Sequence, residues 1–253
     1  MFGLQRHTLK NRFPLFLRCA ASAIALVPLA SGATYSIVAT DSATAQIGGA
    51  GTSCVGSLSV RIIYGPAPGH GAIHAQATLN LAGRDRGAAL LMQDVDPVDI
   101  IADITDPSFD PRASVRQYGV VDLSGRSAGF TGEDDFPFAA DQQGNVDSYT
   151  YSVQGNILTS ANVLDNAEQA FLHEGCDLAD KLMLALEAGA QNGEGDSRCT
   201  PRGIPSDSAF IEVDDDSGEG SLLRIEITNT GNVNPLVLLR EQFDAWRADN
   251  PCP

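Results

Sequence analysis

The sequence predicts an α+β fold in which antiparallel sheets are covered by helices on their outer faces. Two observations predict it. Short segments rich in β-branched residues come in pairs separated by turns of Gly, Asp or Ser, which is typical of hairpins. Longer segments with apolar residues at helical spacing also come in pairs and stand between the groups of strands. The order is strands, two helices, strands, two helices, strands and one helix.

The N-terminal third begins with a hairpin. Its second strand is rich in glycine, which weakens a strand but lets another backbone or a ligand approach closely. A loop at 65–69, with two prolines and two glycines, separates this hairpin from the next strand. The expected elements are strands at 34–40, 46–54 and 72–78, and helices at 83–93 and 97–104.

The remainder repeats the pattern. A Leu-Ser-Gly turn at 123–125 joins two strands, and Leu178, Leu182 and Leu186 share one face of an amphipathic helix. The acidic run at 214–219 lacks the ligand spacing of a calcium loop and is expected to be a solvated hairpin tip. The expected elements are strands at 114–122, 126–131 and 149–154, helices at 161–173 and 178–188, strands at 209–213 and 222–227, and a helix at 235–248.

The first 33 residues have the pattern of a secretory signal. Residues 1–18 carry four basic side chains and no acidic one, and an apolar run from Cys19 to Leu29 follows. That run is shorter than the roughly 20 residues of a membrane span. Ser31 and Ala33 place small side chains before a cut that follows Ala33. We expect residues 1–33 to be removed and residues 34–253 to form one secreted or periplasmic domain.

The expected mature chain is strongly acidic. The full chain has 16 Lys and Arg against 32 Asp and Glu, and four of the basic residues lie in the signal. This charge argues against nucleic acid or, after signal removal, a membrane as a partner. The sequence contains no phosphate-binding loop or dinucleotide fingerprint, and its histidines do not cluster at metal spacing, so no cofactor or metal is expected. The oligomeric state stays open, with a homodimer as one alternative.

The segments that follow the expected cut resemble a known family. The mature start Thr34-Tyr35-Ser36-Ile37-Val38-Ala39, followed by an Asp turn and the glycine-rich strand, is similar to a widespread bacterial family of unknown function that is assigned by fold to the N-terminal nucleophile hydrolases. The likeness covers most of residues 34–248. It implies a four-layer αββα sandwich with the N-terminus at the mouth of a cleft. Further matching stretches are QATLN (76–80), RQYGVVD (116–122), FTG (130–132), YSVQGN (151–156), LEAG (186–189), GDSR (195–198) and SAF (208–210).

The activity that this resemblance implies is amide hydrolysis, as in penicillin acylases or proteasome β-subunits. Thr34 Oγ would attack the carbonyl of a small amide or peptide-like substrate, and the α-amine of Thr34 would accept the hydroxyl proton. An acyl-enzyme would form and then hydrolyse. Asn80 and Asn156 are the candidate side-chain donors for the oxyanion hole.

The sequence departs from the proteasome-like pattern, because no lysine lies between Thr34 and His173. Ser53 and Gln76 could instead orient the amine by hydrogen bonds, and Asp196 is expected in the same cleft. Each has a structural alternative as a strand hydroxyl, a structural amide or a turn cap. The alternative function is therefore a secreted binding module that reuses the fold without catalysis.

Four cysteines remain after the signal, and an even number in an oxidising compartment predicts two disulfides, although free buried thiols are an alternative. Placing Cys54 and Asp196 at the same cleft favours Cys54–Cys199, which leaves Cys176–Cys252 to tether the C-terminus. The main rival pairs Cys176 with Cys199, because a helix of about 13 residues and nine further residues could span the return.

Overall fold

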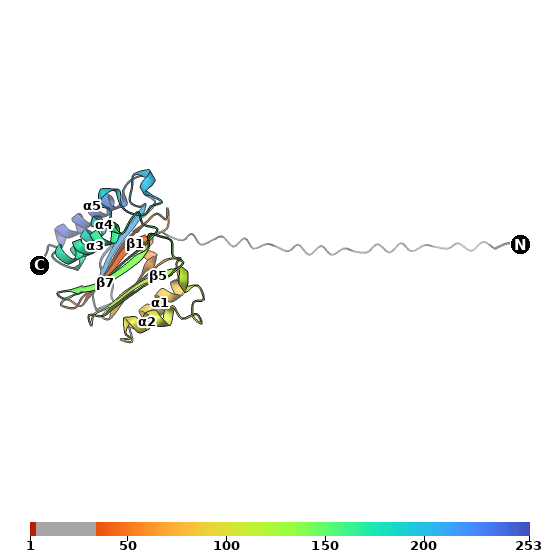
Figure 1. The fold of residues 1–253 in the computed structure, drawn as a ribbon, viewed down its shortest axis with the longest axis horizontal. Helices are drawn as coiled ribbons and strands as arrows, with labels where there is room; N and C mark the ends of the chain where they lie inside the picture. Colours follow the sequence, from red (N-terminus) through yellow and green to blue (C-terminus); the bar gives the residue numbers. More distant parts are fainter. Residues whose placement is uncertain (4–33) are drawn as a thin grey trace.

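The computed structural model describes residues 1–3 and 34–253, and the fold occupies residues 34–253 (Figure 1). Apart from its first three residues, the expected signal segment lies outside the described residues. Two antiparallel sheets and five α-helices make up the fold, so the α+β expectation is confirmed. None of the helices in the described part of the chain is both long and apolar enough to cross a bilayer.

The larger sheet has six strands, and the first strand of the fold lies near its centre. The strand order is β10-β9-β2-β1-β8-β7, with every neighbouring pair antiparallel. The glycine-rich β2 is thereby covered on both edges. The strands are β1 (Thr34–Asp41), β2 (Gln46–Ser53), β7 (Ala140–Val146), β8 (Tyr149–Asn156), β9 (Ser208–Asp214) and β10 (Ser221–Ile227).

The smaller sheet has four strands in the order β3-β4-β5-β6. These strands are β3 (Tyr64–Ala67), β4 (Gly71–Ala77), β5 (Arg116–Asp122) and β6 (Ser127–Thr131). It packs face to face on the larger sheet: Val38 of β1 and Ile47 of β2 belong to one buried cluster with Ala72 of β4 and Val121 of β5.

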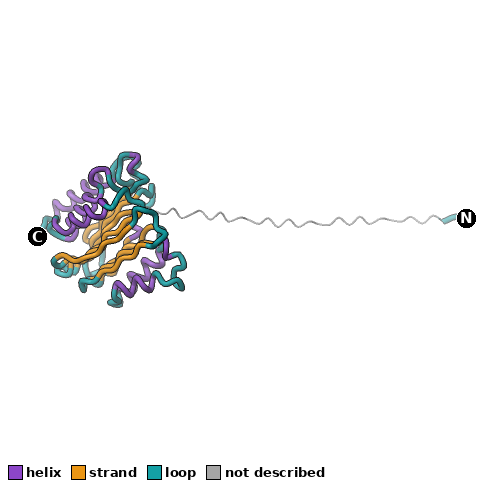
Figure 2. The backbone as a smooth tube through the Cα atoms, in the orientation of Figure 1, coloured by secondary structure: helices purple, strands orange, loops and turns teal. Residues whose placement is uncertain are grey.

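The helices cover the two outer faces, so that helices, sheet, sheet and helices follow one another through the molecule (Figures 1 and 2). On the smaller sheet, Ile100 and Ile104 pack with Ile73 and Val120. Successive side chains of β1 point to opposite faces of the larger sheet. Those that point away from the smaller sheet pack against α3 and α4. The helices are α1 (Leu81–Leu91), α2 (Pro97–Ile104), α3 (Asn162–His173), α4 (Leu178–Gly189) and α5 (Pro235–Asp249).

Two strands of the structure were not expected from the sequence, and both lie at sheet edges. β3 was expected to be part of a loop because Gly65 and Pro66 stand within it; a proline has no N–H for a ladder, which restricts it to an edge. β7 is mostly polar and half-exposed, so its sequence shows no apolar alternation. The other expected strands and helices are present, with ends displaced by a few residues.

Candidate functional site

Thr34 begins β1 and lies between the ends of two neighbouring strands. The pairing register sets it opposite Ser53, the last residue of β2, and opposite Asn156, the last residue of β8. Directly opposed residues of antiparallel strands project to the same face of a sheet. Thr34 Oγ1 donates a hydrogen bond to Ser53 Oγ at 3.1 Å, and both side chains are buried. Three of the expected site residues therefore meet at one end of the central strands.

Gln76 of β4 connects this point to the smaller sheet. Its Nε2 donates to the carbonyl oxygen of Thr34 at 3.2 Å and to Gln117 Oε1 at 2.8 Å. Its Oε1 accepts a hydrogen bond from Ser36 Oγ at 2.6 Å. Because both ends of this buried amide are engaged, Gln76 holds the main chain of Thr34 from across the inter-sheet space.

Gln117 of β5 extends the same buried network to Asn156. Asn156 Nδ2 donates to Gln117 Oε1 at 3.1 Å, while Gln117 Nε2 donates to the carbonyl oxygen of Gly155 at 2.8 Å. Asn156 Oδ1 is buried and has no hydrogen-bond partner among the described residues. Asn156 thus lies beside Thr34 as part of the network that joins the sheets, with its donor directed to Gln117. Gln117 belongs to one of the stretches that resemble the family, but no local sequence signal marks it as a site residue.

Asn80 is placed elsewhere. It is the N-cap of α1, where its Oδ1 accepts from the N–H of Gly83. Its Nδ2 donates to Asp110 Oδ2 at 2.8 Å and to Tyr118 OH at 3.1 Å. Both amide hydrogens are therefore used, so Asn80 supplies no donor at Thr34. This geometry does not support the role in an oxyanion hole that the sequence suggested for it.

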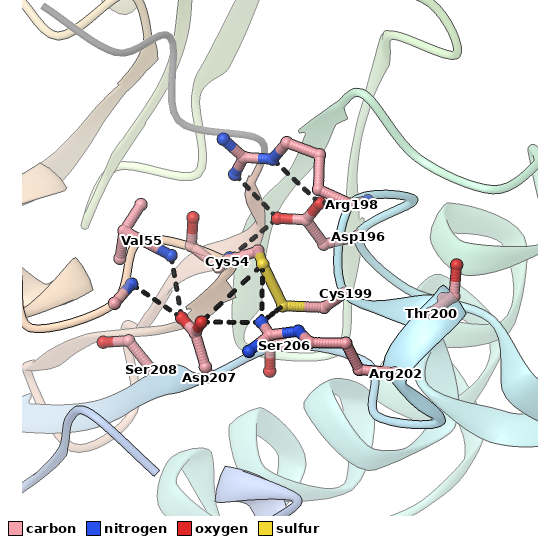
Figure 3. The surroundings of a disulfide bond; sticks show 12 residues. Cys54, Val55, Asp196, Arg198, Cys199, Thr200, Arg202, Ser206, Asp207 and Ser208 are labelled. Atoms are coloured by element: carbon pink, nitrogen blue, oxygen red, sulfur yellow. Dashed lines mark hydrogen bonds and ion pairs between the residues drawn. A yellow bond between two sulfur atoms is a disulfide. The ribbon is translucent and has the colours of Figure 1, made fainter. Parts of the chain in front are cut away.

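Asp196 is fully buried and holds the segment that leaves β2 (Figure 3). Its Oδ2 accepts from the N–H of Cys54 at 2.7 Å and from Arg198 Nη2 at 2.8 Å. Asp196 was expected in the cleft. In the structure it lies behind the cleft wall, where its carboxylate accepts hydrogen bonds from Cys54 and Arg198.

A second carboxylate, Asp207, fixes the next residues of that wall. Its Oδ1 accepts from the N–H groups of Val55 and Gly56, each at 2.8 Å (Figure 3). Its Oδ2 accepts from Arg202 Nη2 at 2.7 Å. Sequence reasoning missed this residue, because an aspartate between Ser206 and Ser208 gives no sign that it reaches residues about 150 positions away.

The disulfides join the expected cysteines. Cys54 is bonded to Cys199, with a Cα–Cα distance of 5.8 Å, and Cys176 to Cys252, with a distance of 5.9 Å. The pairing expected from the sequence is confirmed over its rivals. The first bridge fastens residue 54, directly after Ser53, to the loop that contains Asp196.

Thr34 lines a pocket of about 200 Å³. Ser53, Gln76 and Arg198 are its other polar lining residues, and the remainder is apolar. Most of the apolar wall comes from the segment between β2 and β3. The apolar lining residues are Cys54, Val55, Leu58, Val60, Ile62, Ile63, Ala77 and Leu79. The pocket brings together Thr34, Ser53 and Gln76 from the expected set, while Asp196, Asn156 and Asn80 do not line it.

His74 is buried in the inter-sheet space beneath the network. Its Nδ1 lies 2.9 Å from Ser36 Oγ. Gln154 Nε2 lies 3.3 Å from the same Nδ1. The ring packs beside Tyr64 and Phe210, and its Nε2 has no hydrogen-bond partner among the described residues. Burial lowers the pKa of His74 to about 3, so the ring is neutral at physiological pH.

This neutral histidine is expected to make the fold sensitive to acid. Between pH 6.5 and 3 the unfolded chain binds a proton at His74 and the folded chain does not, so stability falls as pH drops. From pH 7 to 4.5 the loss is about 2–3 kcal/mol. In urea unfolding at both pH values, His74→Gln should show a correspondingly smaller loss than the wild type. Equal losses in the two proteins would contradict the assignment.

Asp135 changes the stability with pH in the opposite direction to His74. Comparing His74→Gln with the wild type removes the contribution of Asp135. Burial raises the pKa of its carboxyl to about 6. Through that group the folded chain binds more protons than the unfolded chain at mildly acidic pH, which favours folding as pH falls. Because Asp135 is present in both proteins, the difference between their pH slopes reports His74.

The chain is similar to known proteins over most of its length. The model of one protein family, described as a family of unknown function (DUF1028), matches residues 34–235. Among solved structures, the crystal structure of protein SPO2555 from Silicibacter pomeroyi, also assigned to DUF1028, is similar with a TM-score of 0.69 and 24% identity. The match covers 85% of this chain and 89% of that one, and it shows a shared fold. No curated protein matches the chain.

Proposed function

This chain belongs to the DUF1028 family of unknown function, and from the geometry of its own site we propose that it is a secreted amidohydrolase whose nucleophile is an N-terminal threonine, Thr34. The proposal includes kinship in fold with the N-terminal nucleophile hydrolases. The succession of helices, two antiparallel sheets and helices supports that kinship, as does the resemblance of the segments that follow the expected cut.

The observation that carries the proposal is the position of Thr34. It is the first residue of the central strand, the first residue that the family model matches, and a lining residue of an apolar pocket. A cut before it would create an α-amine on a hydroxyl-bearing residue that lines the pocket. An α-amine has a reference pKa near 8, which suits a general base at neutral pH.

The reaction is written as acyl transfer to Thr34 followed by hydrolysis. Thr34 Oγ1 attacks the amide carbon, and its proton passes to the α-amine, directly or through a water. The protonated amine then delivers the proton to the leaving nitrogen as the C–N bond breaks, which leaves an ester on Thr34. Water, deprotonated by the same amine, hydrolyses the ester and regenerates the hydroxyl.

Neighbouring side chains position this single-residue apparatus. Ser53 accepts the hydrogen of the Thr34 hydroxyl and so directs the oxygen, and Gln76 holds the Thr34 carbonyl. The lysine nearest in sequence after Thr34 is Lys181, whose Nζ donates to the carbonyl oxygens of Phe171 and Glu174, so the mechanism assigns the base role to the α-amine.

Secretion would itself create the active site. Two disulfides are compatible with an oxidising compartment, and the signal pattern of residues 1–33 supplies the route. We expect protein exported by a bacterial host to have the intact mass of residues 34–253 with two disulfides. A different first residue would remove the chemistry, because the amine and the hydroxyl would no longer belong to one residue.

A direct test compares two chains that differ by one residue. One begins at Thr34, and the other begins at Ala33, where a peptide bond occupies the Thr34 nitrogen. Both should fold alike, and only the chain that begins at Thr34 should hydrolyse members of a panel of fluorogenic acyl amides. Equal turnover by both would overturn the N-terminal mechanism. Ligand binding by both chains with turnover by neither would support the non-catalytic binding module instead.

A further inference from the structure

Most of the described residues that line the pocket beside Thr34 are apolar. Ser53 and Gln76 are hydrogen-bonded to Thr34 and so form one polar group with it, to which the pocket adds Arg198. Among the apolar lining residues, the side chains of Val60, Ile63 and Ala77 are almost completely buried. A bound amide could therefore place its carbonyl at Thr34 only with an apolar group along the rest of the pocket, since a polar group there would lose its hydrogen bonds to water without replacement.

The charge of the pocket favours an uncharged group. Among the described residues that line it, the one with a charge is Arg198, whose guanidinium forms an ion pair with the buried carboxylate of Asp196 at 2.8 Å. The same carboxylate also accepts from the N–H of Cys54. The positive charge of Arg198 is thus compensated by a group that the fold holds in place, so a carboxylate on the acyl group would gain little there.

The size of the pocket limits the length of the group. A cavity of 150 Å³ lined by aliphatic and aromatic side chains accommodates benzene. The pocket at Thr34 has about 200 Å³. We propose that it is the acyl site of the reaction, and that it takes an uncharged, apolar acyl group of about six to eight carbon atoms. This inference rests on the proposed function, because the acyl carbonyl is placed at Thr34.

The first measurement is a chain-length series. Amides of 7-amino-4-methylcoumarin with acetyl, butanoyl, hexanoyl, octanoyl and hexadecanoyl groups are assayed with the chain that begins at Thr34. Burial of one CH₂ corresponds to about a fourfold gain, so kcat/KM should rise about fourfold per methylene up to six to eight carbons and then stop rising. The adipoyl amide, which has six carbons and a terminal carboxylate, should be a poorer substrate than the hexanoyl amide.

The second measurement is independent of turnover. Octanamide binding to Thr34→Ala is measured by calorimetry, alone and combined with Leu58→Asp. Leu58 lines the pocket and is 47% exposed, so a carboxylate there should fold normally and weaken octanamide binding several-fold. The matched control is Leu222→Asp, a leucine of β10 that is 44% exposed and lies outside this pocket, and it should leave binding unchanged.

The outcomes separate the two proposals. Amide hydrolysis with no dependence on acyl length, a preference for adipoyl over hexanoyl, or octanamide binding that Leu58→Asp leaves intact would overturn the acyl site while leaving the hydrolase standing. Octanamide binding that Leu58→Asp weakens, with no hydrolysis of any amide, would keep the pocket assignment for apolar groups and overturn the hydrolase.

Discussion

Replacing Thr34 by alanine, in the chain that begins at residue 34, should abolish amide hydrolysis and leave the fold intact. The substitution removes the attacking oxygen but keeps the α-amine and the strand. Loss of a catalytic nucleophile costs on the order of 10⁶ in kcat in a serine protease. The structural cost is the hydrogen bond from Thr34 to Ser53, worth about 1 kcal/mol. Hydrolysis rates and urea unfolding midpoints measure the two effects separately.

Ser53→Ala is the matched control, because it removes the same hydrogen bond from the other side and keeps the nucleophile. Its unfolding midpoint should resemble that of Thr34→Ala. Its activity should fall only moderately, since Ser53 orients the hydroxyl without reacting. Thr34→Ser should retain part of the activity, because hydroxyl and amine both remain. Undiminished turnover in Thr34→Ala, or an equal loss in Ser53→Ala, would end the assignment of Thr34 as nucleophile.

The elements that the sequence predicted well have a local cause. The hairpin of β1 and β2 has a turn signal between two strand-like segments, and α2 and α5 each begin at a capping residue followed by proline. β3 and β7 lack such signals because their strand character comes from pairing with β4 and β8. An edge strand with one covered side needs no apolar alternation, so propensity alone does not reveal it.

The site was predictable where the residues lie on neighbouring strands and not where it is assembled from loops. Thr34 and Ser53 face each other because a short hairpin sets their register. The support of the pocket wall by Asp207 and the network role of Gln117 arise from contacts across the fold, which no spacing in the sequence encodes. For Asn80 the sequence suggested a donor in the site, whereas the structure uses its side chain as the cap of the helix that follows it.

Removing the Cys54–Cys199 disulfide should impair both stability and activity. The bridge closes a loop of 145 residues, for which the chain-entropy model gives roughly 5 kcal/mol, a large share of the 5–15 kcal/mol that stabilises a typical domain. Cys54 also lines the pocket and follows Ser53 directly. Without the bridge, the wall that carries Val55 and Leu58 loses its covalent link to the loop of Asp196 and is held by hydrogen bonds, among them those to Asp196 and Asp207.

The other bridge provides the control for this prediction. Cys176–Cys252 closes a loop of 76 residues, worth roughly 4–5 kcal/mol in the same model, and both of its cysteines are exposed and outside the pocket. Replacing either pair by serine should therefore lower the unfolding midpoint by a similar amount. Measured at a temperature where both variants are folded, the Cys176/Cys252 variant should hydrolyse amides like the wild type, and the Cys54/Cys199 variant should lose most of its kcat/KM. The two bridges have similar expected effects on stability, so a difference in activity between the variants reports the position of the bridge. Equal activity of the two variants would therefore show that the pocket wall does not depend on Cys54–Cys199.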